Sequence, residues 1–87
     1  MPDIIIYTKD YCPYCIKAKN LLKRKGYEQI TEIDITQNEP LQKEMTLKSG
    51  GRKTVPQIFI NATHVGGCDD LYALDSAGKL DDILAGK

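Results

Sequence analysis

Residues 4–15 read Ile4-Ile5-Ile6-Tyr7-Thr8-Lys9-Asp10-Tyr11-Cys12-Pro13-Tyr14-Cys15, an apolar β-branched run that leads into two cysteines. Cysteines at this spacing cannot share one face of a strand, but they can meet in the first turn of a helix. The N–H groups of that turn have no intrahelical partner, and the positive end of the helix dipole favours a thiolate over a thiol. The pattern predicts a strand, a turn and a helix N-terminus suited to reversible thiol–disulfide exchange.

The remainder of the chain alternates between strand and helix patterns. We expect strands over residues 4–8, 28–35, 57–60 and 63–65, the last two forming a hairpin around 61–62. We expect helices over 13–25, from 39–40 to about 50, over 68–75, and briefly after 78. A helix joins the first two strands, which should therefore be parallel, and the hairpin adds an antiparallel pair. The predicted fold is α/β, in the order β-α-β-α-β-β-α, with helices on both faces of a four-stranded mixed sheet.

The two cysteines should differ in role because of their places on the helix. Cys15 belongs to an apolar stripe that includes Ala18, Leu21 and Leu22, so it should point inward and stay protonated as a resolving thiol. Cys12 lies at the helix entry near Lys9 and should be the exposed nucleophile. Such a setting lowers a cysteine pKa from about 8.5 to ~3.5–7.5, so most of Cys12 would be ionised at neutral pH.

Length and composition limit the function classes. The chain has 87 residues, 41% of them hydrophobic and 28% charged, which is typical of one globular domain, here residues 1–87. A formal net charge of zero gives no support to a nucleic-acid partner. There is no basic-then-apolar leader and no apolar run that could span a bilayer. Three cysteines are an odd count, unlike a secreted disulfide framework. We expect a monomeric cytoplasmic protein without a membrane partner.

Two structural alternatives remain for the cysteine pair. A disulfide between such close neighbours would close a very short loop and constrain the unfolded chain little. A zinc site could use Cys12, Cys15, His64 and Cys68, although the two ligand pairs are much further apart than in common zinc motifs. We expect no metal, and we expect His64 to be a surface residue of the hairpin.

Three motifs together resemble glutaredoxins, most closely the small bacterial dithiol type. They are Lys9 with Cys12-Pro13-Tyr14-Cys15, then Thr54-Val55-Pro56 before a strand, then Gly66-Gly67-Cys68-Asp69-Asp70. A lone Cys-x-x-Cys would be weak support, but here the motifs have the order and distances of that family over essentially the whole chain. The resemblance implies a thioredoxin-like fold, with a cis Val55-Pro56 bond facing the cysteines. A cis bond would turn the Val55 N–H and C=O toward a substrate backbone.

The resemblance also implies that glutathione is the co-substrate. The N–H groups of Cys68 and Asp69 would bind its γ-glutamyl carboxylate at a helix N-terminus, and the Asp69 side chain would take its ammonium group. Bare glycines such as Gly67 would permit this close approach. The other expected contacts are Lys9 and Arg52 to the glycine carboxylate, Tyr14, and the segment Thr54, Val55 and Pro56. The ordinary alternatives are that Lys9 and Arg52 are solvated charges, Tyr14 a packing residue, and Cys68 a small residue at a helix entry or a modifiable thiol.

The function implied is that of a glutathione-dependent thiol–disulfide oxidoreductase. Cys12 would reduce protein–glutathione mixed disulfides, and the Cys12/Cys15 dithiol would reduce protein disulfides, with glutathione reductase acting indirectly. One rival is a similar electron donor recharged by thioredoxin reductase. The other is an iron–sulfur carrier that bridges two chains through Cys12 and two glutathiones, although members that do this typically carry Cys-Gly-Phe-Ser.

Overall fold

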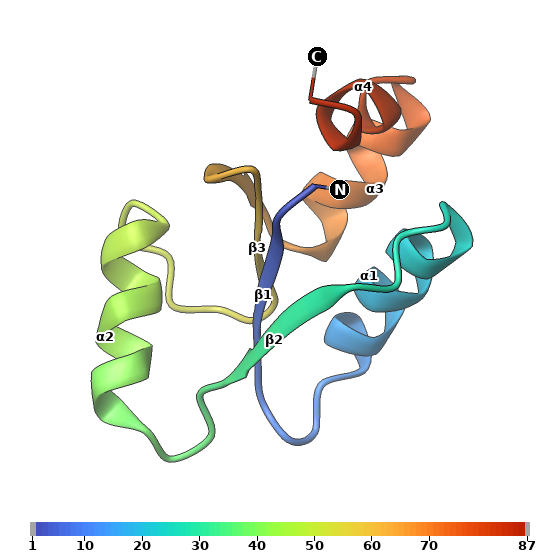
Figure 1. The fold of residues 1–87 in the computed structure, drawn as a ribbon. Coiled ribbons are helices and arrows are strands. Elements are labelled where there is room, and N and C mark those ends of the chain that lie inside the picture. The colour runs from blue at the N-terminus through green and yellow to red at the C-terminus, as the bar shows by residue number, and fades with distance from the viewer. Residues whose placement is uncertain (1, 87) are drawn as a thin grey trace.

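A computed structural model describes residues 2–86; Met1 and Lys87, the ends of the expected 1–87 domain, lie outside the described residues. Its strands are β1 (Ile4–Thr8), β2 (Ile30–Asp34), β3 (Gln57–Ile60) and β4 (Thr63–Gly66). Its helices are α1 (Pro13–Arg24), α2 (Glu39–Lys48), α3 (Cys68–Ser76) and α4 (Leu80–Leu84). The element order agrees with the sequence expectation, including the short helix after Gly78 (Figure 1).

The four strands form one mixed sheet in the order β2-β1-β3-β4. β1 pairs in parallel with β2, placing Ile4 opposite Ile30, and antiparallel with β3, placing Ile4 opposite Ile60. β3 and β4 form the predicted hairpin, with a register irregularity between Ile58 and Phe59. The parallel pair and the antiparallel hairpin are therefore both confirmed.

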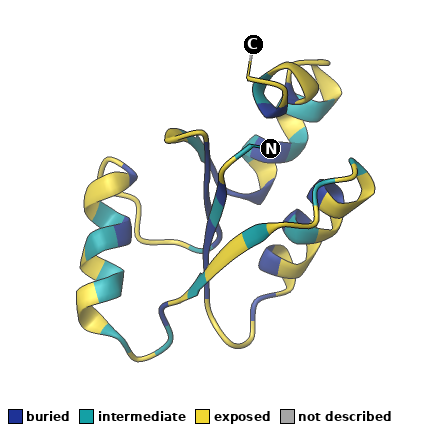
Figure 2. Cartoon of the chain, viewed as in Figure 1, coloured by how far each residue is buried: buried dark blue, intermediate teal, exposed yellow. Residues whose placement is uncertain are grey.

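Helices cover both faces of the sheet, as expected (Figure 1). On one face, Ile4 and Ile6 pack in a core with residues of α1, α3 and α4, among them Leu22, Leu71 and Leu80. On the other face, α2 supplies Met45 to a smaller core whose buried members are Tyr7, Ile35, Met45 and Phe59. Figure 2 shows the consequence: the central strands are buried, whereas the outer sides of the helices are exposed. β1 lies between the two cores, which explains its nearly continuous apolar sequence.

Several element boundaries differ from the prediction by one or two residues. β2 spans only Ile30–Asp34, because the pairing with β1 ends where β1 ends, at Thr8 opposite Asp34. Helix α1 stops at Arg24, with Lys25 as its C-cap and Gly26 following at a φ of +93°. A left-handed glycine after the cap is the termination that the sequence predicts. None of the helices within residues 2–86 combines the length and apolar character needed to cross a bilayer.

Candidate active site

The two cysteines occupy the first turn of α1. Cys12 is the N-cap, with extended backbone angles, and Pro13 takes the first helical position, where its missing N–H is not needed. Cys12 and Cys15 are joined in a disulfide with their Cα atoms 5.2 Å apart, so the structure represents the oxidised form. The Cys15 backbone N–H donates a hydrogen bond to the Cys12 sulfur at 3.1 Å. The helix N-terminus thus directs a donor at this sulfur, as the spacing predicts.

Cys12 is more covered than expected. Its exposed fraction is 8%, against 2% for Cys15, so both residues are buried in the oxidised form. The disulfide bond and the Cys15 N–H take up part of the surface that the sulfur would otherwise present. The predicted inward placement of Cys15 is confirmed, and the aromatic neighbours Tyr11 and Tyr14 are exposed, by 87% and 60%.

A hollow of about 150 Å³ adjoins this turn, and three separate segments form its walls. They are the first turn of α1, the loop before β3 and the first turn of α3. Most of the residues that the sequence predicts as ligand contacts meet here: Tyr14, Arg52, Thr54, Val55, Pro56, Gly67, Cys68 and Asp69, together with Asp70. The Val55-Pro56 peptide bond is cis, as predicted.

Asp70 is a member of this site that the sequence analysis did not assign. One of its carboxylate oxygens, Oδ2, accepts the Gly67 N–H and an Arg52 N–H, each at 2.9 Å. The Gly67 N–H, followed by the Arg52 guanidinium, holds the pKa of the Asp70 carboxyl below its usual value. An acid three residues after a helix N-cap is the capping-box pattern, and this signal could have found it.

The reason for the paired glycines also differs in part from the prediction. Gly66 has a φ of +118°, and a Cβ atom there would collide with the carboxyl group of Asp70. A Cβ atom on Gly67 would lie 3.4 Å from an Arg52 nitrogen and 3.5 Å from the Pro56 carbonyl oxygen. Gly66 is therefore required by the protein's own Asp70 contact, and Gly67 lies where the loop before β3 approaches α3.

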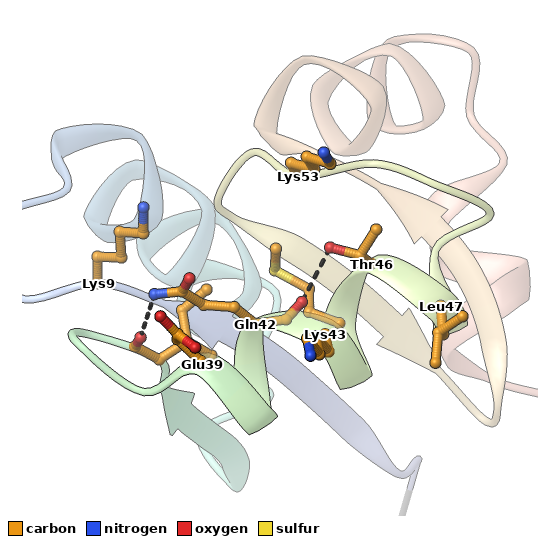
Figure 3. Close-up of a pocket in the computed structure, with 9 residues that line it drawn as sticks. Lys9, Glu39, Gln42, Lys43, Thr46, Leu47 and Lys53 are labelled. Atoms are coloured by element: carbon orange, nitrogen blue, oxygen red, sulfur yellow. Dashed lines mark hydrogen bonds between the residues drawn. The ribbon is translucent and has the colours of Figure 1, made fainter.

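Lys9 and Arg52, the two cations expected at the glycine carboxylate, line different hollows. Arg52 is paired with Asp70. Lys9 lines a second hollow, of about 500 Å³, together with residues of α2, among them Glu39, Gln42 and Thr46 (Figure 3). Lys53, the chain neighbour of Arg52, also lines this second hollow.

The remaining sequence candidates have mainly packing roles in this structure. Cys68 is a free thiol, only 5% exposed, and burial raises its pKa. His64, expected at the surface of the hairpin, is half-buried: its ring centroid lies 4.9 Å from that of Phe59, and its Nε2 lies 2.7 Å from Gln57 Oε1. Within residues 2–86, no group of three or more histidine, cysteine or acidic side chains is placed to hold a metal ion.

A dithiol at a helix N-terminus, opposite a cis-proline loop in a four-stranded mixed sheet, defines a thiol–disulfide oxidoreductase of the thioredoxin-like fold. The family model described as Glutaredoxin matches residues 4–65. Glutaredoxin 3 of Escherichia coli strain K12 is 55% identical over 84 residues, covering 97% of this chain and 99% of that protein.

Solved structures agree with this match. The solution structure of glutaredoxin from Brucella melitensis is 57% identical, with a TM-score of 0.82 over 98% of this chain and 91% of that one. The crystal structure of a buckwheat glutaredoxin–glutathione complex is 28% identical, with a TM-score of 0.86 over 98% of this chain and 78% of that one. The chain belongs to the glutaredoxin family, whose members are glutathione-dependent thiol–disulfide oxidoreductases.

Proposed function

We propose that Cys12 is the attacking thiolate and Cys15 the resolving thiol of this oxidoreductase. The Cys12 thiolate attacks the glutathione sulfur of a glutathionylated protein, the disulfide breaks, and the protein leaves as a thiol. Glutathione then remains on Cys12 as a mixed disulfide. A second glutathione thiolate attacks that disulfide, oxidised glutathione leaves, and Cys12 returns to the thiolate.

A protein disulfide follows a longer route through both cysteines. Cys12 attacks one sulfur and forms a mixed disulfide with the substrate, whose other sulfur leaves as a thiol. Cys15, losing its proton, attacks the Cys12 sulfur, which releases the second substrate thiol and forms the Cys12–Cys15 disulfide. Two glutathiones restore the dithiol and become one oxidised glutathione. Potentials of about −200 to −230 mV are typical of the family, close enough to that of the glutathione pool for reversible operation.

The observation that carries this assignment is the hydrogen bond from the Cys15 N–H to the Cys12 sulfur. In the reduced protein the same donor faces a thiolate at the positive end of α1, and the first turn of that helix contains no acidic residue. Cys15 lies three residues further along, in the same turn but buried, where a thiol stays protonated until the mixed disulfide brings a sulfur within reach.

The proposed glutathione site is the 150 Å³ hollow beside this turn. The N–H groups of Cys68 and Asp69, the first residues of α3, have no intrahelical partner and suit the γ-glutamyl carboxylate. The Asp69 carboxylate suits the adjacent ammonium group. The buckwheat relative, solved as a glutathione complex, supports glutathione as the ligand.

The central part of glutathione is proposed to contact Tyr14 and the segment 54–56. Within residues 2–86, the Val55 N–H and C=O make no backbone hydrogen bond, so both remain available to a ligand backbone. Lys9 and Arg52 are proposed to reach the glycine carboxylate, Lys9 from the neighbouring hollow and Arg52 from the wall of this one, where it also pairs with Asp70.

The wider proposal is a monomeric cytoplasmic enzyme without a metal, acting on glutathionylated or disulfide-containing proteins and recharged through glutathione reductase. The test is a coupled assay in which purified protein, glutathione and glutathione reductase act on a small glutathione mixed disulfide. Turnover with glutathione, and none when thioredoxin reductase replaces the glutathione system, is the expected result. Recharging by thioredoxin reductase alone would contradict the proposal, and colour in freshly purified protein would point to the iron–sulfur carrier instead.

A further inference from the structure

The loop before β3 forms one wall of the proposed glutathione site, yet its own backbone does little to hold it. Within the described chain, residues 52–56 make no backbone–backbone hydrogen bonds. Besides the Arg52–Asp70 ion pair, two buried side chains hold this loop. The Ser49 hydroxyl donates to the Arg52 carbonyl at 3.0 Å, and the Gln57 amide nitrogen donates to the Thr54 carbonyl, also at 3.0 Å. The position of the wall therefore depends on side chains.

Gln57 is the more unusual of these two residues. It is fully buried, with an exposed fraction of 0%, at the first position of β3. Its Nε2 contacts two Thr54 oxygens, the carbonyl at 3.0 Å and Oγ1 at 3.3 Å, while its Oε1 lies 2.7 Å from His64 Nε2. Burying a primary amide is costly unless both ends are hydrogen-bonded, and here both ends are.

The chemistry of these partners decides which way the amide faces. A carbonyl oxygen can only accept a hydrogen bond, so the Gln57 NH₂ group must face Thr54, and its Oε1 must face His64. An amide oxygen also only accepts, so His64 Nε2 must carry a proton. The His64 ring also packs against Phe59, with the ring centroids 4.9 Å apart and the ring planes tilted by 37°.

We propose that Gln57 is a positioning residue of this oxidoreductase, and that His64 holds the Gln57 amide in the direction that the Thr54 carbonyl requires. Gln57 holds Thr54, and with it Val55 and Pro56, where a glutathione-bearing substrate can pair with them. It does not itself line the hollow, so it acts only through Thr54. The inference rests on the proposed glutathione site. It adds Gln57 and His64, which lie behind the loop that forms one wall of that site.

The first test is Gln57→Leu, which keeps the approximate size of the side chain but removes the donor to Thr54. We expect KM for a small glutathione mixed disulfide to rise about tenfold, as when a polar contact is lost from a binding site. The rate of iodoacetamide labelling at Cys12 should not change, because the thiolate depends on α1 and not on this loop. Thr63→Ala, at an exposed residue next to His64 in β4, is the matched control and should leave both quantities unchanged.

The second test compares two variants of His64. His64→Phe keeps an aromatic ring against Phe59 but cannot donate to Gln57, whereas His64→Gln restores a donor. We expect KM to rise about threefold in His64→Phe and to stay within about twofold of the unmodified protein in His64→Gln. Nitrogen NMR of the unmodified protein should show the proton of the neutral His64 ring on Nε2.

Several results would overturn the inference. One is a folded Gln57→Leu variant whose KM stays within twofold, and another is a variant that loses Cys12 reactivity together with glutathione affinity, since the role would then be merely structural. If Gln57→Leu does not fold, the comparison of His64→Phe with His64→Gln tests the inference instead. Equal KM values for these two variants would then overturn it. So would a neutral ring protonated on Nδ1. If the unmodified protein shows no turnover with glutathione, both the proposed function and the role of Gln57 are wrong. If it turns over normally and the variants have an unchanged KM, only the role of Gln57 is wrong.

Discussion

Arg52 Nη1 lies 2.9 Å from Asp70 Oδ2, so one ion pair joins the loop before β3 to the first turn of α3 across the hollow. The same oxygen accepts the Gly67 N–H, which ties the cap of α3 to this contact. Both side chains are nearly half exposed, so the charge attraction itself contributes little stability. Its main consequence is geometric, because two walls of the proposed ligand site are held by one carboxylate.

We expect Asp70→Asn to lower the free energy of unfolding at neutral pH and to leave it unchanged in acid. The folded-state pKa of Asp70 is lowered by the Gly67 N–H and by Arg52, so its stabilisation is complete above the unfolded-state pKa of about 4. That stabilisation is lost as the pH falls through the folded-state value. Denaturant unfolding of both proteins from pH 7 to about pH 2 should show curves that converge in acid. A difference that is constant with pH would contradict the assignment to the charged form.

Gly66→Ala should destabilise the fold much more than Gly78→Ala. Both glycines have positive φ values, +118° and +72°, but only at Gly66 would the new Cβ meet the Asp70 side chain, with Cγ 2.8 Å away. A left-handed conformation costs an alanine about 1–2 kcal/mol, and the collision should add about 1–3 kcal/mol at Gly66. Urea unfolding measures the difference, and equal losses in the two variants would show that Asp70 simply moves aside.

Cys12→Ser should abolish all activity, whereas Cys15→Ser should keep deglutathionylation and lose most protein-disulfide reduction. The reason is that only Cys12 carries the attacking sulfur, while Cys15 is needed only to resolve a mixed disulfide with a protein. Parallel assays with a glutathionylated peptide and with a disulfide-bonded protein measure the two activities. Equal loss of both activities in Cys15→Ser would mean that the roles are not divided in this way.

Asp69→Lys should weaken the apparent affinity for glutathione by roughly 10- to 150-fold, because it removes a charge-assisted contact of ~1.5–3 kcal/mol. The reactive thiolate of Cys12 should remain. A lysine here also repels the ligand ammonium and opposes the dipole of α3. Glutathione kinetics and iodoacetamide labelling of Cys12 make the comparison. Asp82→Lys makes the same charge change at an exposed residue in α4 and is the control. Unchanged glutathione affinity in a folded Asp69→Lys protein would place the ligand elsewhere.

Much of the architecture follows from local sequence. The β-branched run before Cys12 predicts β1, the apolar stripe predicts the buried face of α1, and Gly26 predicts its end. These features depend on backbone propensity and on side chains that repeat with the period of the element, so neighbouring residues suffice to reveal them. The motifs that carry the family resemblance also identify most of the residues that line the hollow.

The sequence by itself thus determined the dithiol, the helix that presents it and the glycine-rich start of α3. Only the tertiary structure decided that Arg52 pairs with Asp70, and that His64 lies behind the wall in contact with Gln57. Those contacts join residues from different elements, and nothing in the local pattern of either partner specifies the other. They arise because the fold brings the loop before β3, the β3–β4 hairpin and α3 together, so that each polar group pairs with the group that packing places beside it, and the buried Gln57 amide requires such a partner.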